Sequence, residues 1–274
     1  MAQSIPLVLM KLCQEVQTLN ALSPQKWLVD KASLDDVKTM QAEAKANSNF
    51  DPLSLRSSMW KDVETGRSKL LCKTCENAKV VYIQQGREEP PWDLWARIFQ
   101  WLGPPQTAPK WRVFWFPASI KRTYPLRGEE VGPSSLNGGY SYPCRSDTIV
   151  VYRYEEATRV LLHEILHAAC CDPHNYPLPF KEANTETWAE LFLVALLGKG
   201  SERETAALWR IQSQWIANQN AILRTRFGVD GPKDYAWRYT VGREAILESL
   251  KIELPAPNNL RIRSSRLTSP ELCP

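Results

Sequence analysis

The sequence has no long apolar run and no large excess of either charge. Its 274 residues contain no stretch of the roughly 18 to 20 apolar residues that a membrane-spanning helix needs. Lysine and arginine total 34 and acidic residues total 30, for a formal net charge of +4. That balance is too mild to indicate a nucleic acid or a membrane as partner by itself. With 43% hydrophobic and 23% charged residues, the composition predicts a folded globular chain and excludes wholesale disorder.

The seven cysteines lack any pattern typical of a secreted disulfide scaffold. Their number is odd, they are scattered, and the chain is long enough to bury its own core. The first residues include a short apolar stretch but no preceding basic residue, and Lys11 and Glu15 follow. We therefore expect reduced thiols in an intracellular, cytoplasmic protein. The pair Cys72 and Cys75 has no second pair or spare histidine to complete a zinc site, so we interpret these two as incidental thiols.

The order of elements predicts an α+β fold with a small mixed sheet and a mostly helical C-terminal half. We expect a helical region over residues 1–50, a main domain over 51–254 and a flexible basic tail over 255–274, where Arg261, Arg263 and Arg266 lie at a solvated end. Proline, glycine, serine and asparagine favour an extended loop over 117–147, and Asn137-Gly138-Gly139 indicates a turn within it. The expected strands are 78–83, 111–116 and 148–152, and the expected helices are 92–102, 155–171, 181–197, 201–224 and 233–250.

Histidine is scarce, and its placement carries the functional argument. The three histidines, His163, His167 and His174, lie within twelve residues, and the first two form the pattern HExxH. Positions i and i+4 share one face of a helix, so both imidazoles can reach one metal ion. Glu164 is rotated by about 100° from His163, which lets it hold a metal-bound water rather than bind the metal.

The alternative is a core helix in which both histidines have ordinary hydrogen-bond partners. The other residues of this helix are apolar, which predicts that it is buried. Burying two imidazoles is costly unless their nitrogens find partners, and a metal ion supplies one partner to each ring. The pattern therefore favours Zn²⁺ as a cofactor.

Catalytic zinc needs a third protein ligand and an open position for water. Glu186 follows His167 after eighteen intervening residues, on a second helix that is expected to be buried. Glu190 lies on the same face and is predicted to accept a hydrogen bond from a histidine ring, and Glu182 is a weaker ligand candidate one turn earlier. The alternative interpretation of these three residues is a partly solvated stripe at the start of the helix.

His174 is the alternative third ligand. Its position approaches the arrangement HExxHxxGxxH but adds one residue and lacks the glycine. Proteins of that class also have a methionine turn beneath the metal. All four methionines of this chain, at positions 1, 10, 40 and 59, precede the motif. We therefore prefer Glu186 and keep His174 as the second possibility.

The HExxH pattern followed by Glu186-Thr187-Trp188-Ala189-Glu190 resembles the gluzincin metallopeptidases. More loosely, residues 137–197 resemble predicted metallopeptidases of large DNA viruses, through Asn137-Gly138-Gly139, the segment 149–156 and the HExxH helix. The resemblance implies a zincin-like fold, in which Glu164 takes a proton from a zinc-bound water.

The same resemblance implies how a peptide would be held. We expect the strand over 148–154 to be an edge strand that pairs with an extended peptide. The downstream segment offers Tyr235, Arg238 and Tyr239 as donors to a tetrahedral oxyanion, and Tyr239 is our choice. Surface and packing roles are an equal alternative for each of these three residues.

The sequence thus predicts zinc-dependent hydrolysis of peptide bonds, with a peptide or protein as substrate. Two other classes stay open. One is a zinc-stabilised scaffold or binding protein without catalysis, and the other is a zinc hydrolase of a non-peptide substrate.

Overall fold

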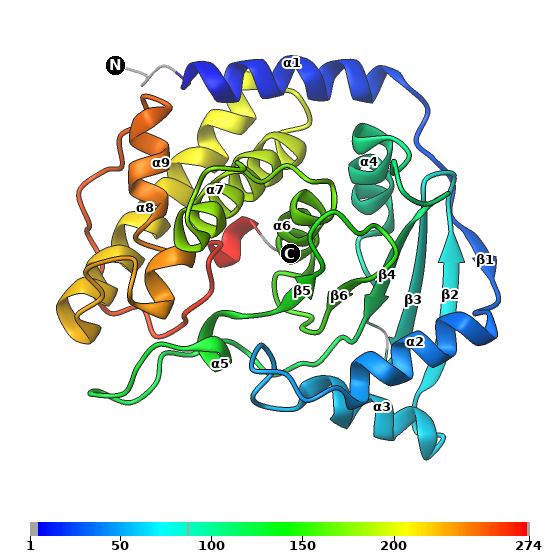
Figure 1. Cartoon of the computed structure of the whole chain (residues 1–274). Coiled ribbons are helices and arrows are strands. Elements are labelled where there is room, and N and C mark those ends of the chain that lie inside the picture. The colour runs from blue at the N-terminus through cyan, green and yellow to red at the C-terminus, as the bar shows by residue number, and fades with distance from the viewer. Residues whose placement is uncertain (1–4, 87, 273–274) are drawn as a thin grey trace. The chain divides into compact units, whose positions relative to one another are not determined.

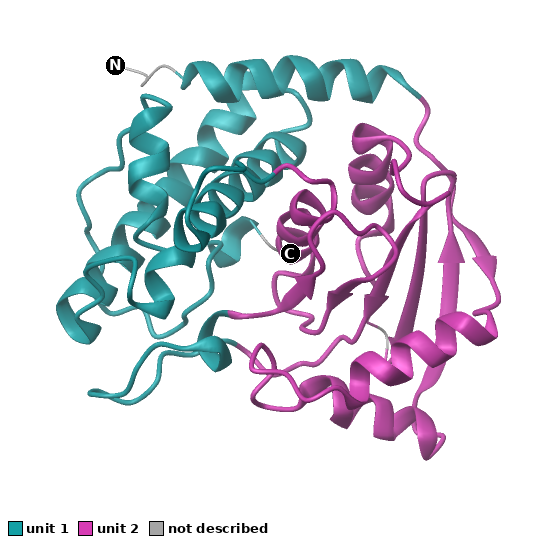
Figure 2. Cartoon of the chain, viewed as in Figure 1, with its two compact units in different colours: residues 1–22, 122–136, 172–274 teal, residues 23–121, 137–171 magenta. Residues whose placement is uncertain are grey.

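A computed structural model describes residues 5–86 and 88–272, and they form an α+β protein (Figure 1). The chain divides into two compact units, shown in teal and magenta in Figure 2. Unit 1 comprises 1–22, 122–136 and 172–274, and unit 2 comprises 23–121 and 137–171. These bounds differ from the three consecutive regions expected from the sequence, because each unit is assembled from segments that are distant along the chain.

Unit 2 contains a six-stranded mixed sheet with the order β1-β2-β3-β4-β6-β5. The strand β4 pairs in parallel with β3 and with β6, and the other pairs are antiparallel. The strands predicted near 78, 111 and 148 are confirmed as β3, β4 and β6, whereas β1, β2 and β5 were missed. The strand bounds are β1 Leu28–Asp30, β2 Lys69–Thr74, β3 Ala78–Gln84, β4 Trp111–Trp115, β5 Gly139–Ser141 and β6 Ile149–Val151.

The prediction of an edge strand over 148–154 was wrong. The strand β6 lies between β4 and β5, so both of its sides are paired. The edge is β5, which runs antiparallel to β6 with Tyr140 opposite Val150. It arises from a segment that composition alone assigned to a loop.

The glycines of Asn137-Gly138-Gly139 do not form the predicted turn. Gly139 is the first residue of β5, and its φ is not positive. A Cβ atom at this position would lie 2.5 Å from Val160 Cγ1 and 2.7 Å from the carbonyl oxygen of Val150. Glycine is therefore required here for space, because a helix packs closely against the strand.

Helices cover both faces of this sheet (Figure 1). On one face, α2 (Leu34–Lys45) and α3 (Leu55–Glu64) bury Met40 and Trp60 in one apolar cluster with Phe114 of β4. The other face carries α4 (Trp92–Leu102) and α6 (Ala157–Ala168). There Trp95 packs edge-to-face on Trp115, 6.1 Å between ring centres, and its indole N–H donates to the Thr158 hydroxyl. The alternation along β4 thus separates two apolar layers.

Unit 1 is helical and centres on α7, Leu178–Leu197, which has buried residues on every side. It packs against α1 (Leu7–Ala21), α8 (Glu202–Phe227), the 3-10 helix η1 (Tyr235–Tyr239) and α9 (Arg243–Ser249). The short helices α5 (Pro133–Leu136) and η2 (Pro270–Leu272) complete it. The single helix expected over 233–250 is replaced by η1 and α9. Among the described residues, none of the helices has the length and apolarity to cross a membrane.

The C-terminal segment differs from the flexible tail that the sequence predicted. Leu267 and Thr268 are buried against unit 1. The Gln212 amide donates to the Leu267 carbonyl at 3.0 Å, and the Trp215 indole donates to the Arg266 carbonyl at 2.9 Å. Side chains of α8 thus hold the extended C-terminal segment through its backbone carbonyls. Because these contacts use the backbone, the segment needs no hydrophobic periodicity from which its order could be predicted.

Candidate metal centre

The helix α6 carries the HExxH residues and is almost entirely buried within unit 2. It follows β6 after a short connection and packs against β5 and β6. It ends at Ala168, earlier than expected, and Cys170 takes a left-handed conformation with φ 59°. The Cys170 and Cys171 N–H groups donate to the His167 and Leu166 carbonyls, which terminates the helix.

His163 and His167 face each other, as the i, i+4 spacing predicts. Their Nε2 atoms lie 3.0 Å apart, and the two rings meet edge-to-face with centres 4.6 Å apart. Their exposed fractions are 6% and 9%. Two imidazole nitrogens therefore converge on one point inside a mostly apolar environment.

This geometry fits a zinc ion with little adjustment. Zinc–nitrogen bonds of about 2.0–2.1 Å at a tetrahedral angle place two ligand nitrogens about 3.3 Å apart. The His163 and His167 nitrogens need to separate by only a few tenths of an ångström to reach that distance. The same 3.0 Å also suits an N–H···N hydrogen bond between two neutral rings, which is the structural form of the core-histidine alternative.

Glu164 is held by a residue that the sequence analysis missed. The Ser141 hydroxyl lies 2.9 Å from Glu164 Oε2 and 2.9 Å from the Glu164 backbone carbonyl, and it donates its one proton to these oxygens. Ser141 follows Gly139 by two residues on β5, so both residues present the same face of the strand to α6. The available signal was the spacing of Gly139 and Ser141, a small residue and a hydroxyl two positions apart. This spacing places both residues on one face only if the segment is a strand, which the sequence did not indicate.

The carboxylates of α7 belong to unit 1. Glu186 and Glu190 are buried, with exposed fractions of 2% and 1%, and Glu182 is half-buried. Glu190 accepts a hydrogen bond from the Thr268 hydroxyl at 3.2 Å, and Arg243 Nη1 lies 3.8 Å from the same oxygen. Glu190 thus has partners within its own unit. Its predicted hydrogen bond to a histidine stays a prediction, as does the ligand role of Glu186.

Tyr239, the predicted oxyanion donor, lies at the end of η1 and is buried in unit 1. Burial, with Glu182 and Tyr235 adding to it, raises the pKa of the Tyr239 hydroxyl well above its ordinary value. The hydroxyl is therefore protonated and able to donate at any physiological pH. Arg238 instead lies over the Tyr235 ring, 4.9 Å from its centre.

His174 is exposed in the segment that precedes α7. Pro173 stands before it and Pro177 immediately before the first residue of α7. A ligand in this segment would be positioned by a loop, whereas Glu186 lies on the part of α7 that is mostly buried, from Ala183 onward.

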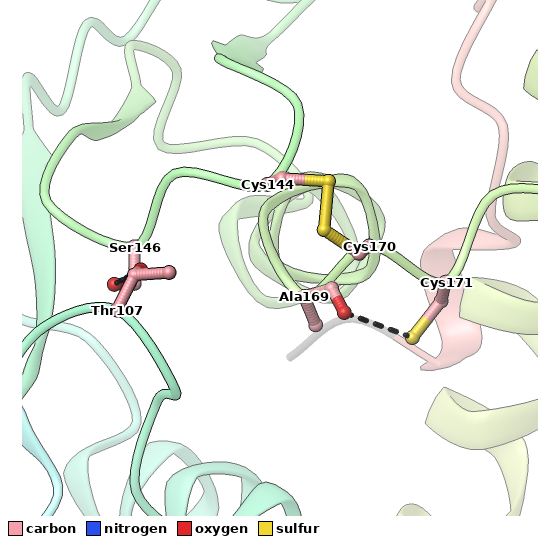
Figure 3. The surroundings of a disulfide bond; sticks show 6 residues. All are labelled: Thr107, Cys144, Ser146, Ala169, Cys170 and Cys171. Carbon is pink, nitrogen blue, oxygen red and sulfur yellow. Dashed lines mark hydrogen bonds between the residues drawn. A yellow bond between two sulfur atoms is a disulfide. The ribbon is translucent and has the colours of Figure 1, made fainter.

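A disulfide between Cys144 and Cys170 joins the loop after β5 to the end of α6 (Figure 3). The Cys144 N–H also donates to the His167 carbonyl at 3.0 Å. This pairing differs from the expectation that all thiols are reduced. The two cysteines are 26 residues apart, and only the β5–β6–α6 arrangement brings them together.

The thiols of Cys72 and Cys75, which the sequence analysis interprets as incidental, lie in the interior of unit 2. Both are buried and free, and burial raises their pKa values, that of Cys72 to about 11. Reactive or metal-binding cysteines need the thiolate form. In the part of the chain that the structure describes, neither cysteine belongs to a cluster that could hold a metal ion.

Comparisons of the chain with protein-family models, with curated proteins and with solved structures found no match. The interpretation of this site therefore rests on the chemistry and geometry of its own residues.

Proposed function

We propose that this protein is a zinc-dependent peptidase with a zincin-like variant of the α+β fold. The observation that supports it best is the 3.0 Å approach of the His163 and His167 Nε2 atoms on a buried helix, with Glu164 between them in sequence. A buried pair of imidazoles beside a carboxylate is the donor set that zinc prefers. Zinc bound there supplies Lewis-acid chemistry, which polarises a water molecule and a substrate carbonyl.

The proposal gives a separate role to each residue of the site. His163 and His167 would hold the metal, and Glu164 would accept a proton from the attacking water molecule. Ser141 fixes the Glu164 carboxylate. Glu186 is proposed as the third ligand from its spacing and its burial, and the protonated Tyr239 hydroxyl is proposed as the donor to the developing oxyanion.

The substrate is proposed to be an extended peptide that pairs with β5. The Tyr152 N–H donates to the Gly138 carbonyl, and Tyr140 lies opposite Val150. Hydrogen-bonded pairs alternate along antiparallel strands, so the backbone groups of Gly139 and Ser141 point away from β6. A peptide bound along this side lies next to the residue that orients Glu164.

Glu164→Gln tests the catalytic part of the proposal. The amide keeps the shape of the side chain but cannot accept the proton, so the variant should retain zinc and lose hydrolysis of a broad peptide library by several orders of magnitude. Equal hydrolysis by parent and variant would contradict the role of Glu164. A parent that holds zinc and cleaves no peptide would favour the scaffold or the non-peptide hydrolase, and activity on small ester substrates separates these two.

The compartment is a separate proposal. We propose a cytoplasmic location from the odd number and scattered positions of the cysteines, although the Cys144–Cys170 disulfide is more typical of an oxidising compartment. Alkylation of free thiols during cell lysis, followed by measurement of the protein mass, distinguishes a reducing compartment from an oxidising one. Modification of Cys144 and Cys170 would support the cytoplasm, and their protection would contradict it.

A further inference from the structure

A cleft of about 540 Å³ lies within unit 1, apart from any residue of the proposed metal centre. It lies among the segment that precedes α5, the C-terminal end of α8 and the extended segment near 262. Its size is typical of small-molecule sites. The lining residues are Tyr124, Pro125, Arg127, Thr225, Arg226, Phe227, Ile262 and Arg263.

The lining is cationic without any acidic side chain. It includes Arg127, Arg226 and Arg263, which come from three separate segments. Within residues 5–86 and 88–272, none of these three forms an ion pair, although Arg224 nearby pairs with Glu244. The C-terminal end of a helix carries a partial negative charge, which favours a cation such as Arg226 in the last turn of α8. Arg127 and Arg263 lie outside this helix, so its dipole does not explain their presence. Three like charges around one hollow repel each other unless an anion binds between them.

The cleft is also preformed. The rings of Tyr124 and Phe227 stack with centres 5.3 Å apart, and the Tyr124 N–H donates to the Arg263 carbonyl at 3.4 Å. The Arg226 guanidinium donates to the Leu260 carbonyl, which fixes that side chain at the end of α8. Burial raises the pKa of Tyr124 to about 12, so its hydroxyl adds no negative charge near the arginines. The stacked rings of Tyr124 and Phe227 thus line the same cleft as the three arginines.

We propose that this cleft binds a phosphate-bearing ligand, whose anionic oxygens contact Arg127, Arg226 and Arg263. Guanidinium groups match the spacing of phosphate oxygens and bind them through charge-assisted hydrogen bonds. The ligand is either a free polyphosphate or an organic phosphate whose apolar part packs on Tyr124 and Phe227. The proposal does not depend on peptidase activity.

Calorimetric titration of the full chain with pyrophosphate, ADP and citrate tests the site. We expect pyrophosphate and ADP to bind, with affinities that fall as the salt concentration rises. Tighter binding of ADP identifies an organic phosphate, and equal binding identifies a free polyphosphate. Binding of citrate as tight as that of pyrophosphate would overturn the assignment to phosphate, and failure of both phosphate probes to bind would overturn the site.

The double variant R127Q/R263Q locates the binding. Both side chains are exposed and form no ion pair, so the variant should keep the melting temperature of the parent. We expect its affinity for either phosphate probe to fall at least tenfold, because the variant loses two guanidinium groups that would donate charge-assisted hydrogen bonds to the phosphate. Arg203→Gln is the matched control, since that side chain is 92% exposed on the same unit but outside the cleft. Unchanged affinity in the double variant would show that the phosphate binds elsewhere.

Discussion

The Ser141 hydroxyl on the edge strand β5 lies 2.9 Å from Glu164 Oε2 on the helix α6. Two residues earlier, Gly139 leaves the space that lets Glu164 Cγ approach, because a Cβ there would lie 3.2 Å from that carbon. The strand therefore both admits and orients the carboxylate. The hydrogen bond from Ser141 holds the Glu164 carboxylate in one orientation, which the proposed base needs when it accepts a proton.

Ser141→Ala should lower kcat for peptide hydrolysis about tenfold while the zinc content stays unchanged. The lost hydrogen bond contributes about 1–2 kcal/mol, which corresponds to roughly a tenfold change in rate because the carboxylate is no longer held in one orientation. Ser141→Thr retains the hydroxyl and serves as control. An unchanged kcat in Ser141→Ala would show that Ser141 has only a structural role.

Gly139→Ala should destabilise the protein by about 1–3 kcal/mol, because the new methyl group meets Val160 Cγ1 and the Val150 carbonyl. Chemical denaturation measures the change. Gly132→Ala is a matched control, since no atom lies within 4 Å of its added Cβ. Adding Val160→Ala to the first variant should restore part of the stability, and no recovery would indicate that the backbone contact dominates.

Replacement of the candidate ligands should separate the possible zinc sites. We expect His163→Ala, His167→Ala and Glu186→Ala to lose most of the zinc, measured by elemental analysis of protein purified without chelators. His174→Ala should keep near-stoichiometric zinc. Loss in Glu182→Ala with retention in Glu186→Ala would move the third ligand one helical turn earlier, and loss only in His174→Ala would support the histidine-based class.

Cys144→Ser should lower the free energy of unfolding by about 3 kcal/mol relative to the oxidised parent, since a cross-link of this span restricts the unfolded chain. Treating the parent with a reductant should reproduce the loss in a thermal melt. Cys171→Ser changes an exposed cysteine outside the disulfide and should leave the melting temperature unchanged. If reductant has no effect on the parent, the disulfide does not form in solution.

Asp36 should make the stability of unit 2 depend on pH. Burial by itself raises its pKa, but the Lys79 ammonium at 2.6 Å and the Ser33 capping hydrogen bonds outweigh burial and lower the pKa overall. The lowered pKa stabilises the folded state above the unfolded value of about 3.9, and the contribution disappears as pH falls through the folded value.

Asp36→Asn should therefore cost about 2 kcal/mol at neutral pH, and urea denaturation should show little difference from the parent near pH 2. The control is Asp35→Asn, whose side chain is 74% exposed although it also contacts Arg112. That variant should change stability by less than about 0.5 kcal/mol. A pH-independent cost for Asp36→Asn would mean that its charge is not what stabilises the helix α2.

Local patterns determined the elements that are long and strongly periodic. The helix over 92–102 and the strands near 78, 111 and 148 were predicted because hydrophobic spacing and flanking prolines or glycines act within a few residues. The pairing of His163 with His167 was also predictable, since helix geometry alone fixes residues that are four positions apart.

Only the tertiary structure decided which residues support that pair. Gly139 and Ser141 gain their roles because the three-residue strand β5 pairs with β6 and packs against α6, and such a short strand has no periodicity of its own. Cys144 meets Cys170, and Trp215 holds the carbonyl of Arg266, across chain separations that no local pattern encodes. The sequence by itself thus determined that the two histidines lie side by side on one helix. Only the packing of distant segments decided that Ser141 orients the Glu164 carboxylate. This contact requires β5 and α6 to lie so close that there is no room for a methyl group at Gly139.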